Sequence, residues 1–169
     1  MTEYLSEAII LEKMPNGDTD SRVALYTKRY GKIVAKAKSV RKITSKLSAH
    51  LEPGTIARVR VVEKNGPQIV DALKQGKCDV VPHHLAQVSA LLGEFEPDLQ
   101  LWHMLLAKQF SWRDILSVLG WNPLHAQCAS CHKGDIGFFD TRSQEFFCAE
   151  CVLKKSAHTV LLDIREHGR

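Results

Sequence analysis

The stretch "GKIVAKAKSV", residues 31–40, decides the fold because apolar and basic side chains alternate along it. The apolar set is Ile33, Ala35 and Ala37, and the basic set is Lys32, Lys36 and Lys38. A period of two residues is that of a β-strand with one face buried and one face exposed to solvent. We therefore expect a half-buried strand whose outer face is basic.

A second stretch, "IARVRVV" (residues 56–62), alternates in the same way, with Arg58 and Arg60 opposite three small apolar side chains. Shorter apolar runs at residues 7–11, 22–27 and 68–75 complete a set of five strand candidates. Turn-forming residues such as Gly, Asn, Asp and Pro separate several of them. Five short strands joined by turns are typical of a small barrel or sandwich.

The pattern changes to helical spacing after the last of these strands. Residues 82–95, 97–110 and 111–121 each read as a helix; Ser111 is suited to cap the third, and Gly120 to end it. The chain is therefore predicted to be an α+β protein of two domains. An N-terminal five-stranded domain is expected over residues 1–78, and a small α-helical domain over residues 79–169.

Four cysteines form a C-x2-C-x16-C-x2-C pattern within residues 128–151: Cys128, Cys131, Cys148 and Cys151. This spacing is typical of a four-thiolate zinc site, in which an intervening hairpin brings the two cysteine pairs together. Four protein ligands leave no position for water, so one structural Zn²⁺ per chain is expected. The alternatives are a metal-free remnant and a redox pair. The fifth cysteine, Cys78, is expected to be a small packed side chain.

The charge of the chain is unevenly distributed. The net charge is +4, yet residues 28–64 hold eleven basic side chains against only Glu52 and Glu63. Such asymmetry favours a polyanionic partner over an ordinary solvated surface, which mixes the two signs. Because Tyr30 is the only aromatic residue in the basic run, phosphate contacts are expected to dominate over base stacking. The candidate nucleic-acid-binding residues are Lys32, Lys36, Lys38, Arg41, Lys42, Lys46, Arg58 and Arg60.

Several classes of function are disfavoured by what the sequence lacks. No run approaches the roughly 18 apolar residues of a membrane-spanning helix, and the N-terminus carries acids where a signal peptide needs positive charge. A cytoplasmic protein without a membrane partner is therefore expected. The chain also lacks a phosphate-binding glycine loop, a Ser-His-Asp arrangement and an H-E-x-x-H motif. We accordingly expect that it is not an enzyme.

Taken in order, several stretches resemble the RecO family of bacterial recombination mediator proteins. "EAIILEKMPNGDTDSRVALYTKRYGKIVAKAKSVRK" is similar to the family's N-terminal region, and "SKLSAHLEPGTIARVRV" to its Ser-Lys and Leu-x-Pro features. "DILSVLGWNPLHAQCASC" and "FFCAEC" look like the segments that carry the family's two cysteine pairs. The family's helical domain is usually longer, so this chain resembles a short member of the family.

The resemblance implies an oligonucleotide/oligosaccharide-binding (OB) barrel followed by a helical domain with a zinc site. It also implies binding to single- and double-stranded DNA, annealing of complementary strands, and a nucleoid-associated location. Loading of recombinase onto strands coated by single-stranded-DNA-binding protein is implied as well, with RecR as a partner.

Two other readings remain open from the residues alone. A zinc-stabilised RNA-binding or ribosome-associated module would also combine a barrel with a four-cysteine site. A nucleic-acid hydrolase would need a cluster of carboxylates or histidines near the basic face, and residues 21–51 contain only His50 of those types. Competition between DNA and RNA separates the first of these readings from the DNA-binding and annealing role that the resemblance implies.

Overall fold

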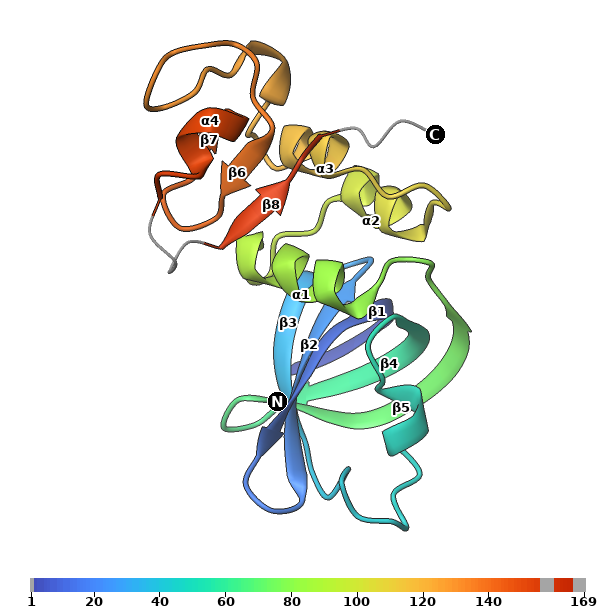
Figure 1. The fold of residues 1–169 in the computed structure, drawn as a ribbon. Coiled ribbons are helices and arrows are strands. Elements are labelled where there is room, and N and C mark those ends of the chain that lie inside the picture. Colours follow the sequence, from blue (N-terminus) through green and yellow to red (C-terminus); the bar gives the residue numbers. More distant parts are fainter. Residues whose placement is uncertain (1, 156–159, 166–169) are drawn as a thin grey trace. The chain divides into compact units, whose positions relative to one another are not determined.

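The computed structural model describes residues 2–155 and 160–165, and the chain divides into two units, Met1–Gln109 and Phe110–Arg169 (Figure 1). The domain boundary that the sequence predicts between residues 78 and 79 lies inside the first unit, at the point where strands give way to helices.

Five strands in the first unit close into a barrel with the order β1-β2-β3-β5-β4. The strands are β1 (Thr2–Asn16), β2 (Asp20–Thr27), β3 (Gly31–Ala37), β4 (Thr55–Glu63) and β5 (Pro67–Lys77). Neighbours are antiparallel except β3 and β5, which run parallel. Only two residue pairs join β3 to β5, Lys36 with Gln68 and Ala37 with Ile69, so this seam is the shortest of the barrel.

The apolar residues of the two alternating stretches fill the barrel interior, which confirms the strand predictions. All six are at most 1% exposed: Ile33, Ala35, Ala37, Ala57, Val59 and Val61. Strand β1 is longer than the predicted residues 7–11, and its middle is buried on both faces. Ile9 and Leu11 face away from the interior yet are buried, because helix α1 (Pro82–Leu91) packs against this strand (Figure 1).

Helix α1 ends at Leu91, earlier than the predicted residue 95, because the following segment pairs with β3. The Phe95 N–H donates to the Lys32 carbonyl at 2.9 Å. Gly31 makes this approach possible: it has φ +70°, and a Cβ there would lie 2.4 Å from backbone atoms of Glu96. Helix α2 (Leu99–Leu106) then begins, with the Asp98 side chain accepting from the Leu101 N–H.

The second unit combines short helices with a small sheet. Its elements are α3 (Trp112–Val118), η2 (Pro123–His125), β6 (Phe138–Asp140), β7 (Glu145–Phe147), α4 (Ala149–Val152) and β8 (Leu161–Asp163). The Ser111 hydroxyl caps α3 as predicted, and Gly120 follows that helix with φ +97°. The hairpin expected between the cysteine pairs is formed by β6 and β7. Strand β8, which the sequence pattern did not predict, completes a three-stranded sheet ordered β7-β6-β8. Within the described residues, no helix has the length and apolar character needed to cross a membrane.

Candidate metal centre and candidate nucleic-acid interface

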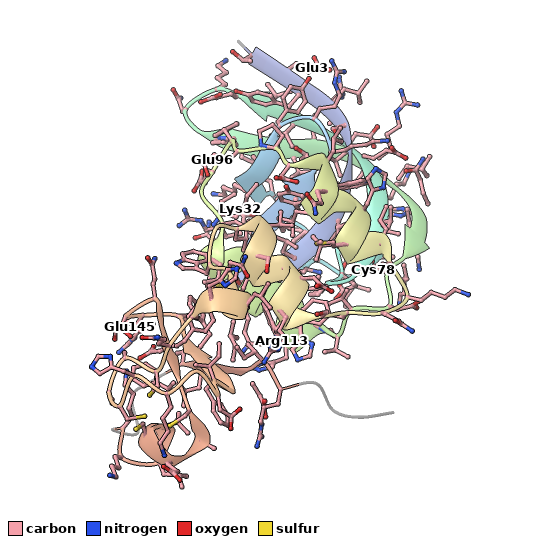
Figure 2. The ribbon with its side chains drawn as sticks, turned by 90° about the horizontal axis from the view of Figure 1, so that it is seen from above. Glu3, Lys32, Cys78, Glu96, Arg113 and Glu145 are labelled. Carbon is pink, nitrogen blue, oxygen red and sulfur yellow. The ribbon has the colours of Figure 1, made fainter. Side chains whose placement is uncertain are left out.

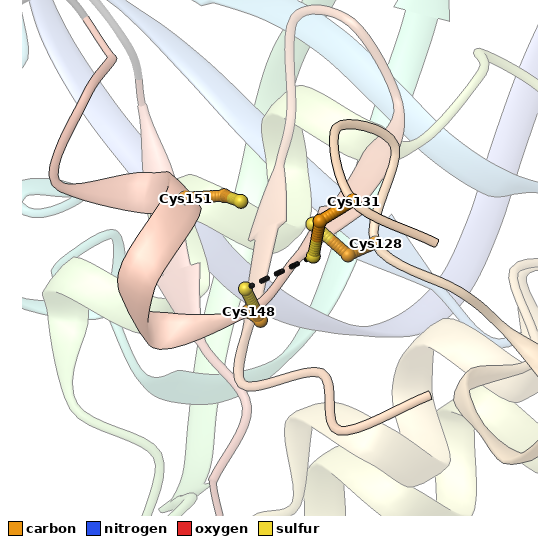
Figure 3. A group of neighbouring side chains, drawn as sticks. All are labelled: Cys128, Cys131, Cys148 and Cys151. Atoms are coloured by element: carbon orange, nitrogen blue, oxygen red, sulfur yellow. Dashed lines mark hydrogen bonds between the residues drawn. The ribbon is translucent and has the colours of Figure 1, made fainter. Parts of the chain in front are cut away.

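The four cysteines of the predicted motif converge in the second unit. Their sulfur atoms lie within 4.8 Å of one another, and Cys131 Sγ is 3.7 Å from Cys148 Sγ (Figure 3). In a tetrahedral site with Zn–S bonds of about 2.3 Å, neighbouring sulfurs are about 3.8 Å apart. The four sulfurs can therefore hold a metal ion, and with four protein ligands the site would be structural.

Backbone geometry aims the sulfurs at one point. His132 has φ +59°, and its N–H donates to the Cys128 carbonyl at 2.9 Å, closing a tight turn around the first pair. Cys148 is the N-terminal cap residue of α4, and Cys151 lies one turn further on. Because β7 ends directly before Cys148, the β6–β7 hairpin carries the second pair to the first.

Two of the four thiols, Cys128 and Cys151, have pKa values shifted in opposite directions. Burial opposes ionisation of Cys128, but hydrogen bonds from the backbone at Cys148, Cys131 and Ser130 outweigh it and lower its pKa to about 6. Hydrogen bonds with the Cys148 and Cys131 thiols, together with burial, raise the pKa of Cys151 to about 12. Four adjacent thiolates repel one another, so full ionisation near neutral pH requires a cation at their centre.

Asp140 is a buried carboxylate on β6, in the hairpin that leads to the second cysteine pair. Its side chain is 2% exposed and accepts from the Arg142 N–H, the Ser143 hydroxyl and Lys155 Nζ, the last at 2.9 Å. Burial raises the pKa of this carboxyl, but these donors outweigh it and hold the pKa below its usual value. The ion pair therefore joins β6 to the segment that follows α4, and Lys155 Nζ also lies 3.7 Å from the centroid of the Phe147 ring.

A groove of about 430 Å³ is lined by residues of β2, β3 and β5, by the last residue of β1 and by the turn between β4 and β5. Two predicted residues line it, Lys36 and Lys38. Arg22 and Lys64, which the sequence analysis did not select, also line it. Arg22 lies in the groove because it is paired directly opposite Lys36 in the β2–β3 ladder. Uncharged residues complete the lining: Asn16, Val34, Ala35, Asn65, Gly66, Pro67 and Gln68.

The basic run contains no acid in sequence, but neighbouring strands bring acids to it in space. Lys36 Nζ lies 2.8 Å from an Asp20 carboxylate oxygen. Arg60 pairs with Glu3 at 3.7 Å, across the β1–β4 ladder. The positive charge is therefore partly neutralised, which residue order alone could not reveal.

The remaining predicted residues differ in whether their side chains form hydrogen bonds within the protein. Lys32 (Figure 2) donates from Nζ to the carbonyls of Ser89 and Leu92, at 2.8 and 2.6 Å. It thus supplies hydrogen bonds to two backbone carbonyls at the C-terminal end of α1. Arg41 donates to the Gly17 carbonyl at 2.9 Å. Lys42 and Lys46 are exposed on the connection that follows β3.

Arg58 and Arg60 lie on strand β4, away from the groove. In the closed barrel β5 separates β4 from β3 on one side, and β1 and β2 separate them on the other. Both arginines line a different hollow, together with Leu5, Asp71 and Leu73. The structure thus brings Lys36 and Lys38 together but does not place all eight predicted residues on one surface.

Two other predicted features have clear positions. Cys78 is half-buried just after β5 (Figure 2), and burial raises the pKa of its thiol. Tyr30 packs edge-on against Tyr4 with ring centroids 5.1 Å apart, and both pack against the barrel core. Among the described residues, no aromatic side chain lines the groove.

Comparisons with known proteins all point to the same protein family. Residues 1–78 match the family model described as "Recombination protein O N terminal". The chain is 27% identical to a DNA repair protein RecO of Dehalococcoides mccartyi, over 88% of this chain and 70% of that protein. It is 25% identical to the Bacillus pumilus DNA repair protein RecO, over 88% of this chain and 68% of that one. A shorter match, to the protein of the same name from Thermodesulfovibrio yellowstonii, reaches 41% identity over 36% of this chain and 24% of the relative. The resemblance recognised in the sequence is confirmed.

Proposed function

We propose that this relative of the RecO DNA repair proteins is a non-catalytic DNA-binding protein of recombinational repair, and that residues 1–78 form an OB-fold domain. The observation that carries the proposal is the basic groove lined by β2, β3, the end of β1 and the turn between β4 and β5. In OB folds the same region, the face of strands 2 and 3 with the adjacent loops, binds oligonucleotides. The relatives' name supplies the role in DNA repair.

The chemistry of the groove favours contacts to phosphate over contacts to bases. Four of its lining side chains are cations, Arg22, Lys36, Lys38 and Lys64, and none is aromatic. Cations neutralise phosphates whatever the base, so binding should be strongly salt-dependent and weakly sequence-specific. Both single and double strands present the same phosphates, so both are proposed as ligands.

Annealing follows from the same electrostatics. Two complementary strands repel through their phosphates, and a basic groove lowers this repulsion while base edges remain free to pair. Loading of recombinase, with RecR and single-stranded-DNA-binding protein as partners, is proposed from the family relationship alone. We assign none of the described residues to those two contacts.

The metal centre is proposed to hold one structural Zn²⁺ through Cys128, Cys131, Cys148 and Cys151. Zinc is the metal that best suits four thiolates in a closed tetrahedral set, and its binding energy contributes to folding. The chain's own residues support this arrangement: Asp140 and Lys155 join β6 to the segment that follows α4, and α4 with its cap residue carries the second cysteine pair.

The test is a pair of titrations with fluorescent oligonucleotides, one DNA and one RNA of the same sequence, followed by a strand-annealing assay. We expect tight, salt-sensitive binding to DNA and faster annealing without ATP. Tighter binding to RNA than to DNA would transfer the proposal to an RNA-binding or ribosome-associated module.

A further inference from the structure

One acid lies beside the basic groove and pairs with a cation that lines it. Asp20, the first residue of β2, directs one carboxylate oxygen to Lys36 Nζ at 2.8 Å and the other to the Ser39 N–H at 2.7 Å. The Thr19 hydroxyl makes a longer contact of 3.4 Å to the same oxygen as Ser39. An anionic group bound by a lysine ammonium and a backbone N–H is chemically similar to a bound phosphate.

We propose that Asp20 is an internal competitor for nucleic-acid phosphates at Lys36. This inference rests on the proposed function, because it concerns the same groove. While Asp20 holds Lys36, the groove offers three unpaired cations among the described residues: Arg22, Lys38 and Lys64. A strand gains the fourth only by displacing the carboxylate.

The exposure of the pair makes such an exchange feasible. The Lys36 side chain is 46% exposed and that of Asp20 is 21% exposed, so solvent and a phosphate can both reach the ammonium. Ion pairs of this kind contribute little, and their exchange costs little. Asp20 would remain anchored by the Ser39 N–H after Lys36 leaves, because that hydrogen bond uses the other oxygen.

A competing acid suits a protein that anneals strands. Each added phosphate contact raises affinity for one strand, and also slows its release after pairing. Asp20 would keep affinity for the strand moderate without removing the lysine that guides it. Asp18 lies in the same turn but has no recorded contact with a groove cation among the described residues, so the role falls to Asp20 alone.

The experiment compares Asp20→Asn with Asp71→Asn. Both changes remove one negative charge from the barrel surface, but Asp71 lines the other hollow, beside Arg60. Asn at position 20 keeps an oxygen that can accept from the Ser39 N–H, so the fold should be retained. Binding to a fluorescent oligothymidylate is measured over a range of salt concentrations.

We expect Asp20→Asn to bind about two- to fivefold more tightly than wild type, and its salt slope to steepen by about 0.7, one more phosphate contact. Asp71→Asn should change affinity less and leave the slope unchanged. Lys36→Gln should cost little in the wild type and more in the Asp20→Asn background. Equal effects of the two Asn variants, or weaker binding by Asp20→Asn, would overturn the inference. Failure of the wild type to bind any oligonucleotide would instead overturn the proposed function.

Discussion

Removing the unpaired cations of the groove is the sharpest perturbation of the proposed interface. Arg22, Lys38 and Lys64 line the groove, and none of the three forms an ion pair with another described residue. The triple variant R22Q/K38Q/K64Q leaves the barrel interior untouched, since all three side chains are exposed. We expect it to fold normally and to lose most of its affinity for a single strand.

The magnitude follows from counterion release. Each phosphate contact on a single strand contributes about 0.7 to the slope of log affinity against log salt, so three contacts contribute about 2. At roughly 0.1 M salt this corresponds to a loss on the order of a hundredfold in affinity. The slope of the triple variant should be shallower by the same amount, about 2.

The matched control is K28Q/R29Q/R58Q. It removes the same charge from the barrel, but its three residues line a hollow beside β1 instead of the groove. Fluorescence anisotropy with an oligothymidylate at several salt concentrations gives both affinity and slope. If the control variant loses as much as the groove variant, net charge alone determines binding and the groove has no special role.

Three further predictions concern the metal centre, the packing of β3 and the pH dependence of the groove. The purified protein should contain about one zinc per chain, and C128S/C131S should lose the metal and unfold at lower temperature, as elemental analysis and calorimetry would show. G31A should lose at least about 2 kcal/mol in chemical denaturation, because a Cβ there meets backbone at 2.4 Å, whereas G17A, with φ +74° and no neighbour within 4 Å, should lose only about 1 kcal/mol. The pKa of Asp20 is lowered, chiefly by its hydrogen bond with Lys36, so its stabilising effect is complete above the unfolded value of about 3.9 and lost as pH falls through the lower folded value. The stability difference between wild type and D20N should therefore shrink on acidification below about pH 4, and a constant difference would contradict this assignment.

The sequence was sufficient for the features that depend on local pattern. Alternation placed Ile33 and Val59 in the barrel interior, and cysteine spacing identified a set of sulfurs that the structure brings within 4.8 Å. The Ser111 cap was also found, because N-caps act over a few residues. These signals are short in range, and tertiary contacts did not override them.

Features that depend on pairing between distant segments could not be obtained from pattern. Lys32 alternates with the apolar residues of β3 as a solvated lysine would, yet it donates to carbonyls at the end of α1, 57 and 60 residues further along the chain. The ion pair of Lys36 with Asp20 depends on the register of β2 and β3. Strand order in the barrel likewise decides that Arg58 lies outside the groove. The count of basic residues along the sequence therefore overestimated how many of them share one surface.

The most direct test of the central claim is the rate at which two complementary DNA strands anneal, followed by fluorescence quenching, with and without the protein. The account predicts faster annealing by the wild type without ATP, little acceleration by R22Q/K38Q/K64Q, and near wild-type acceleration by K28Q/R29Q/R58Q. Equal annealing rates with and without the wild-type protein on naked DNA would contradict it.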